Sequence, residues 1–231
     1  MRTDIDIKFD FRQDTPEGKD PDKHSKTLRR YHKLLWSKHL PSGEFFGLED
    51  TKPGSYLYHR SAVGEFSVSS DAVIPTFKWN RQIKELIPDD ELKAFNAIGY
   101  TIGGMMVFPE NQVDGKWTMN QARGCTGSIG DRFDLTLECI RRHFAEDASP
   151  LSGVLARDAR FFDLFRDFRG YVEYFFLQDL VSADFSAVTI SEPFDNFRGS
   201  PIPSGARQYN AYKTASVMFI EARNQRIMAS G

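Results

Sequence analysis

The sequence predicts an α+β fold in which a mostly antiparallel or mixed sheet of about five or six strands packs with about seven helices. Some segments alternate apolar and polar residues or form short apolar runs, which is typical of strands. Others repeat apolar residues every three or four positions, which is typical of amphipathic helices. The two kinds neither alternate strictly nor separate into blocks, so they favour the α+β class. We expect a single globular domain over residues 1–231, because this length can bury one sizeable core.

The N-terminal segment predicts a strand followed by a helix. Residues 5–11 alternate apolar and charged side chains, with the period of a half-buried strand. A loop rich in Pro, Gly and Asp follows over residues 13–24. Ser25 is then placed to cap a helix that runs to about Lys38. Four apolar side chains of this helix are expected to point inward: Leu28, Tyr31, Leu34 and Leu35.

The middle of the chain predicts strands and two short helices. Residues 56–60 and 65–70 predict a strand pair joined around Gly64. Residues 80–86 and 89–97 predict two helices, separated by a proline that breaks the first.

The best candidate for a central strand is the segment 100–108, because it is apolar at both alternating positions. Gly103 and Gly104 within it indicate either a bulge or a close approach of another segment to the backbone. The Asp-Gly pair at 114–115 predicts a hairpin turn, whose second strand would end at Met119.

The second half of the chain predicts mainly helices. Asp131, followed three residues later by Asp134, is a capping-box variant that places a helix start at Asp131. Residues 133–144 then carry one apolar stripe and one charged face. The remaining predicted elements are a helix from Ser149, a buried aromatic segment over 171–181, a strand over 187–191 and a long terminal helix from Ser204.

Composition limits the class of protein. A net charge of −2 excludes a uniformly basic nucleic-acid binder but leaves room for a local basic patch. The two cysteines are too few for a disulfide scaffold or a structural zinc site, so a reducing cytoplasm is the expected location. We expect Cys125 to be more accessible than Cys139, and no disulfide between them. Because no apolar run is long enough to span a bilayer, we expect no membrane association.

A glycine-punctuated loop in front of the helix at 131 is the first candidate site. Gly124, Gly127 and Gly130 recur at every third position before a helix N-terminus, where backbone N–H groups and the helix dipole favour anions. An ordinary turn-rich loop is the alternative, because the capping carboxylate of Asp131 would repel a phosphate. The candidate ligand-binding residues are Asn120, Gln121, Arg123, Thr126 and Ser128.

Carboxylates near the same helix start are the candidate catalytic residues: Asp131, Asp134 and Glu138. A carboxylate beside a bound phosphate can act as a general base or metal ligand. The alternative is structural, since Glu138 and Arg142 stand in the favourable i, i+4 order for an ion pair and the two aspartates can simply cap.

The segment 23–39 is the most polarised in the chain, with six lysines and arginines and no acid. One interpretation is a basic helix that binds nucleic acid or an acidic partner. The alternative is a solvated outer face whose charge is balanced by acids elsewhere in the chain. The candidate nucleic-acid-binding residues are Lys26, Arg29, Arg30 and Lys33.

Several long blocks resemble a known family. They are TIGGMMVFP, NQARG, DRFDLTLECIRRHF, DFRGYVEYFFLQDLV and FIEARNQRI, and the likeness spans nearly the whole chain. The chain resembles a family of uncharacterised bacterial proteins, a domain of unknown function. The resemblance implies a shared fold in one intact domain, and it carries no catalytic residue or cofactor over to this sequence.

Three hypotheses for function remain open. The first is an enzyme directed at a nucleotide or another phosphorylated small molecule. The second is a nucleic-acid or protein binding module that uses the basic helix over 23–39. The third is a toxin-like transferase that uses a nicotinamide dinucleotide, indicated only by His59, Arg60 and the polar segment 67–70. The sequence assigns no cofactor, metal or oligomeric state.

Overall fold

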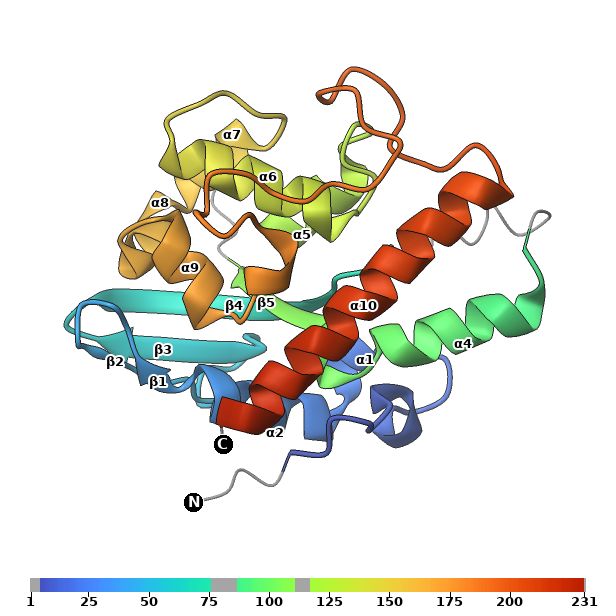
Figure 1. Cartoon of the computed structure of the whole chain (residues 1–231). Helices are drawn as coiled ribbons and strands as arrows, with labels where there is room; N and C mark the ends of the chain where they lie inside the picture. Colours follow the sequence, from blue (N-terminus) through green and yellow to red (C-terminus); the bar gives the residue numbers. More distant parts are fainter. Residues whose placement is uncertain (1–4, 76–86, 111–116, 231) are drawn as a thin grey trace.

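The computed structural model describes residues 5–75, 87–110 and 117–230. Within these ranges the chain is α+β, with nine α-helices and two small antiparallel sheets of two and three strands (Figure 1). The α+β class and the antiparallel pairing are therefore confirmed. The expected sheet of five or six strands is wrong, because the strands of the described residues are divided between two separate sheets.

The three-stranded sheet has the order β3-β4-β5, with β3 at Leu57–Ser61, β4 at Gly64–Ala72 and β5 at Met105–Pro109. Gly64, at φ +136°, turns the chain between β3 and β4, so the predicted strand pair is confirmed. β4 is the central strand, whereas β5 is at an edge of the sheet. The apolar run over 100–108 is therefore not a central strand, although all of β5 is buried. The second sheet pairs β1 (Lys38–His39) with β2 (Phe45–Phe46).

The first long helix, α2 (Lys26–Trp36), begins as the sequence predicts. Ser25 Oγ accepts the N–H of Leu28, and three of the four expected side chains are buried. Leu34 is the exception, at 43% exposed, so its inward placement is wrong. The helix stops before Lys38, because residues 38–39 form β1. Two short helices precede it: η1 (Phe11–Asp14), which reaches into the start of the predicted loop, and α1 (Pro21–His24), which lies within the loop.

The predicted strand over residues 5–11 does not form. The segment pairs with no strand of the described chain, and Asp10 instead caps η1 through the N–H of Arg12. Its apolar residues pack individually on the core, with Phe11 fully buried and its N–H bonded to the carbonyl of Tyr100. The alternation therefore reflects side chains that alternate between core and solvent, without the backbone pairing of a strand.

The terminal helix α10 (Ala206–Ser230) lies against α4 (Asp89–Gly99) and the short helix η2 (Ile102–Gly104) (Figure 1). Both long helices confirm their predictions. At the contact with η2, Asn224 Oδ1 accepts the N–H of Gly103 at 2.8 Å. A close approach at the two glycines, one of the two expected alternatives, is therefore what the structure contains.

The second half of the chain is mainly helical, and an aromatic core lies within it. Tyr171 and Phe175, in the predicted aromatic segment, are buried as expected. The strand predicted over 187–191 is reduced to one isolated bridge between Val181 and Val188. The remaining elements are α5 (Met119–Cys125), α6 (Phe133–Phe144), α7 (Ser152–Arg157), α8 (Ala159–Phe162), η3 (Asp163–Phe165), α9 (Phe168–Tyr174) and η4 (Gln178–Leu180).

The hairpin predicted after residue 104 is wrong at its second strand. Its turn at 114–115 lies outside the described residues, as does the helix predicted over 80–86. Where the second strand was expected to end, α5 begins instead. Thr118 and Gln121 form a complete capping box there, each side chain bonded to the backbone N–H of the other residue.

The expectation for the two cysteines is confirmed. Cys125 is exposed, Cys139 is buried, and both are free thiols. None of the helices in the described ranges is long and apolar enough to cross a bilayer.

Candidate functional site

The start of α6 differs from its prediction. Asp131 has φ +67°, in the left-handed region, and the helix begins after it with Arg132 at the N-cap position and no side-chain cap. The expected capping role of Asp131 is therefore wrong. The left-handed turn places its Oδ1 3.3 Å from Nη1 of Arg123 instead.

The other two candidate catalytic carboxylates take part in local ion pairs. Asp134 accepts hydrogen bonds from Arg132 Nε at 3.0 Å and from the N–H of Ser191 at 3.0 Å. Glu138 accepts from Nε of both Arg141 and Arg142 at 2.8 Å, which confirms the expected pairing with Arg142. Burial opposes the charge of Glu138, but the hydrogen bonds from these arginines outweigh it and lower its pKa.

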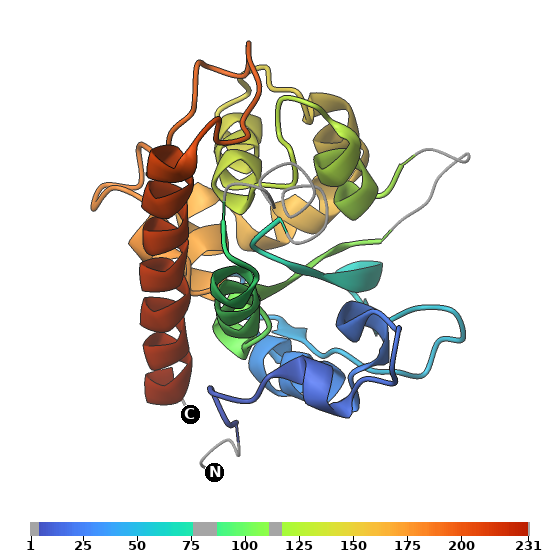
Figure 2. The same ribbon diagram turned by 90° about the vertical axis from the view of Figure 1, so that its right-hand side faces the viewer.

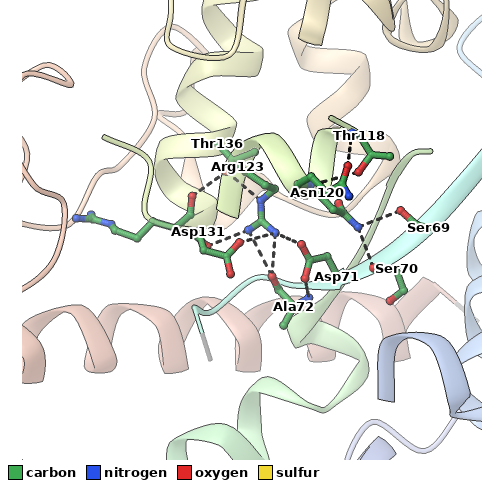
Figure 3. Close-up of polar contacts among 11 residues, drawn as sticks. Ser69, Ser70, Asp71, Ala72, Thr118, Asn120, Arg123, Asp131 and Thr136 are labelled. Atoms are coloured by element: carbon green, nitrogen blue, oxygen red, sulfur yellow. Dashed lines mark hydrogen bonds and ion pairs between the residues drawn. The ribbon is translucent and has the colours of Figure 1, made fainter. Parts of the chain in front are cut away.

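Arg123 of α5 is fully buried next to the end of β4, and its charge is already paired (Figure 3). The guanidinium contacts the carboxylate of Asp71 and donates to the carbonyl of Asp131 at 3.0 Å and to Thr136 Oγ1 at 3.2 Å. With Asp131 as a second ion-pair partner, two carboxylates balance one cation. This arrangement matches the structural alternative for Arg123, because no donor remains directed at a ligand in the loop.

A polar cavity lies near this ion-pair network, along β4 and the start of α5. Figure 2 shows β4 passing between α5 and the N-terminal helices α1 and α2. The cavity between these elements has a volume of about 560 Å³, and we call it the polar pocket. Its polar lining includes Asp22 and Lys23 of α1, Arg29 of α2, Ser69 and Ser70 of β4, and Asn120 and Gln121 of α5, together with Tyr56 and Glu110.

Three buried oxygen atoms around the polar pocket have no hydrogen-bond partner within the described chain. They are Asp22 Oδ1, Glu110 Oε2 and Asn120 Oδ1. The amide of Asn120 cannot be rotated to relieve this, because its Nδ2 donates to the backbone carbonyl of Ser70 at 3.0 Å (Figure 3). Buried polar atoms in native proteins are nearly always paired. These acceptors therefore indicate a ligand that brings hydrogen-bond donors.

Two carboxyl groups beside the polar pocket hold their protons unusually strongly. Burial, followed by the nearby charge of Asp71, raises the pKa of Asp22 well above its ordinary value. Burial also raises the pKa of Asp71 to about 7, although the charge of Arg123 opposes this. Both carboxyl groups therefore keep their protons to a higher pH than isolated aspartates do.

We expect Asp71 to make stability depend on pH. Its folded pKa is above its unfolded pKa, so its contribution to stability is complete below about pH 4 and is lost as pH rises to about 7. In Asp71→Asn this contribution is absent. The melting temperature of the variant, relative to that of the native chain, should therefore increase steadily between pH 4 and 7. A difference that is constant across this range would contradict the raised pKa.

The structure brings together some of the residues predicted for a site and separates others. Asn120, Gln121 and Arg29 line the polar pocket, whereas Thr126 and Ser128 lie in turns beyond α5 and do not. The predicted cationic residues Lys26, Arg30 and Lys33 line a neighbouring cavity.

Sequence reasoning missed Asp22, Asp71 and Glu110. The signal for Asp71 was available, since the run Ser69-Ser70-Asp71 places three polar residues in succession at the end of a strand. Of the residues of the third hypothesis, Ser69 and Ser70 line the polar pocket, whereas His59 and Arg60 do not. His59 is buried, with Nδ1 bonded to the Gly47 carbonyl and Nε2 to Ser61 Oγ.

The described residues hold no group of three or more His, Cys, Asp or Glu side chains that is arranged to bind a metal ion.

Comparison with protein families gives one match. The model of DUF6994, described as a family of unknown function, matches residues 5–227. The chain belongs to the DUF6994 family. The expected likeness over nearly the whole chain is thereby confirmed, and the matched range of this DUF6994 chain includes every residue of the polar pocket. No curated protein and no solved structure matches it.

Proposed function

We propose that this DUF6994 chain is an acid–base enzyme that binds a hydroxyl-bearing small molecule in the polar pocket and transfers a proton through Asp22. The observation that carries the proposal is the convergence of three unpartnered, buried acceptors on one cavity from segments far apart in sequence. A volume of about 560 Å³ lies within the range of small-molecule sites. Hydroxyl groups supply the donors that Asp22, Glu110 and Asn120 lack.

Asp22 is the group placed to exchange a proton with the ligand. It lines the pocket, and burial raises its pKa well above the ordinary value, which favours the protonated carboxyl, the form that acts as a general acid. The proton would pass to a ligand oxygen as a bond to that oxygen breaks. Asp71 lies next to Asp22 but does not line the pocket, so we assign it a positioning role. Its charge favours the protonated form of Asp22, and its ion pair with Arg123 fixes the orientation of the Asp71 carboxylate.

The expected setting is a bacterial cytoplasm. Two free cysteines, one of them exposed, are consistent with a reducing compartment.

A ligand screen followed by a turnover assay tests the proposal. Hydroxylated metabolites would be screened by melting temperature, because a ligand that binds only the folded chain raises it. Compounds that bind would then be incubated with the native chain, and products would be detected by mass spectrometry. We expect Asp22→Asn to reduce turnover by about 10²- to 10⁴-fold, the usual contribution of a general acid.

Asp90→Asn is the matched control, because Asp90 is exposed on α4 and does not line the pocket. It should retain the native rate. Full activity of Asp22→Asn on a compound that the native chain converts would show that proton transfer does not pass through Asp22.

A further inference from the structure

A second cavity adjoins the polar pocket and is lined mainly by cations. It has a volume of about 620 Å³ and runs along the start of α2, and we call it the cationic groove. Lys23 and Arg29 line both cavities, so the two are contiguous. The other cations of the cationic groove are Lys26, Arg30 and Lys33.

Most of these cations form no ion pair in the part of the chain that the structure describes. Only Lys33 forms an ion pair there, with Asp50 at 3.1 Å. Lys23, Lys26, Arg29 and Arg30 form none. The chain as a whole is slightly acidic, with a net charge of −2, so this concentration of positive charge is local. Like charges held together at this density repel one another, and a bound anion relieves the repulsion.

Aromatic rings hold the two arginines of the cationic groove. The guanidinium of Arg29 lies over the ring of Tyr56 at 5.0 Å, and that of Arg30 over the ring of Tyr31 at 5.1 Å. Stacking of this kind occupies a face of the guanidinium and leaves its N–H edge available to grip a phosphate with two hydrogen bonds. The groove is therefore suited to a phosphate group.

The chemistry of the two cavities is complementary within one ligand. The polar pocket presents unpartnered acceptors, which require hydroxyl or amino donors. The cationic groove presents four lysine and arginine side chains that form no ion pair in the described chain, and these attract an anion. We infer that the two cavities form one site for a phosphorylated, hydroxyl-bearing small molecule of the nucleotide or sugar phosphate class. The phosphate lies in the cationic groove, and the hydroxyls lie in the polar pocket. This inference rests on the proposed function of the polar pocket.

The same features argue against a nucleic-acid strand as the ligand. Binding of single strands depends on aromatic rings that are free to stack on successive bases. Tyr31 and Tyr56 are both buried, and each is already covered by an arginine. The basic helix therefore acts as the phosphate-binding half of a small-molecule site.

Binding of matched probe pairs tests the inference. The probes are AMP and adenosine, glucose 6-phosphate and glucose, inorganic phosphate, and a single-stranded DNA oligonucleotide. Calorimetry would give the dissociation constant of each for the native chain at low and high salt. We expect at least one phosphorylated probe to bind at least tenfold more tightly than its unphosphorylated partner. Because the contact is ionic, we expect this advantage to fall as salt increases.

Two double variants with the same change of charge separate the site from general electrostatics. Lys23→Gln with Arg29→Gln removes the two shared cations, whereas Lys93→Gln with Arg207→Gln removes two exposed cations that line neither cavity. We expect the first pair of substitutions to raise the dissociation constant of the phosphorylated probe by about 10- to 100-fold, in line with the loss of charged hydrogen bonds. The second pair should change binding by less than about threefold. Both should melt close to the native temperature, because Lys23, Lys93 and Arg207 are exposed and the half-buried Arg29 is replaced by another polar side chain.

Three outcomes would overturn the inference. In one, no phosphorylated probe exceeds its unphosphorylated partner. In another, both double variants bind alike. In the third, only the oligonucleotide binds, which would make α2 a nucleic-acid surface. Failure of the proposed function gives a different result. Binding would then depend on the phosphate and on Lys23 and Arg29, but no turnover that depends on Asp22 would follow.

Discussion

Replacement of Arg123 by Met is expected to destabilise the folded chain by about 3–5 kcal/mol, because it leaves two partly buried carboxylates without their cation. The side chain of Arg123 is 0% exposed, and those of Asp71 and Asp131 are 21% and 28% exposed. The guanidinium also donates to Thr136 Oγ1 on α6, so it joins β4 to that helix. Met fills a similar length but makes none of these contacts.

Urea unfolding at pH 7 measures the effect of Arg123→Met, with Arg60→Met as its control. Arg60 pairs with Glu65 on the surface at 3.0 Å, with both side chains more than half exposed. Such exposed pairs contribute about 0–1 kcal/mol, so the control should be nearly as stable as the native chain. Combining Arg123→Met with Asp71→Asn should recover part of the loss, because one unpaired carboxylate is removed. Equal stability of Arg123→Met and Arg60→Met would show that the buried network is not structural.

A second large effect is expected at Gly103, where α10 packs directly on the backbone. A Cβ atom at this position would lie 2.4 Å from the carbonyl oxygen of Ile220 and 2.7 Å from Oδ1 of Asn224. The first contact is with helix backbone, which cannot rotate away as a side chain can. It would also displace the hydrogen bond from the N–H of Gly103 to Asn224. We therefore expect Gly103→Ala to destabilise the chain by about 3 kcal/mol, the upper part of the usual range for overpacking.

The control for Gly103→Ala is Gly153→Ala. Gly153 is in α7, and a Cβ atom there would have nothing within 4 Å. Alanine is favoured over glycine in helices by about 0.5–1 kcal/mol, so this variant should melt slightly higher than the native chain. If Gly103→Ala also melted at or above the native temperature, the close packing of α10 on η2 would be disproved.

Elements with a complete local signal could be predicted from the sequence. The Ser25 cap and the apolar spacing of α2 predict its start and its buried face, and the strands on either side of Gly64 are marked by alternation and a turn. The aromatic core and the terminal helix α10 could also be predicted. For the helices and the strand pair, the caps, turns and apolar spacing lie within a few residues of one another, so the local sequence contains them. The aromatic core is predicted by its composition, although it also packs on distant residues such as Trp36.

The way in which these elements pair and pack could not be predicted from the sequence. The N-terminal alternation predicted a strand, yet no neighbouring strand of the described chain pairs with residues 5–11. The apolar run over 100–108 predicted a central strand, whereas β4 occupies the centre. A strand is completed by its partner, and periodicity alone does not identify which segment that partner is.

The sequence alone therefore determined the α+β class, the family, the basic character of α2 and the presence of Asn120 and Gln121 in the site region. Only the tertiary structure decided that Asp22 and Asp71 lie close together and that Arg123 forms ion pairs with two carboxylates. It also decided that the cationic groove meets the polar pocket at Lys23 and Arg29. The physical reason is that proton affinity, pairing and cavity lining depend on burial and on charges from distant segments. These distances are set by packing, and they have no counterpart in the spacing of residues along the chain.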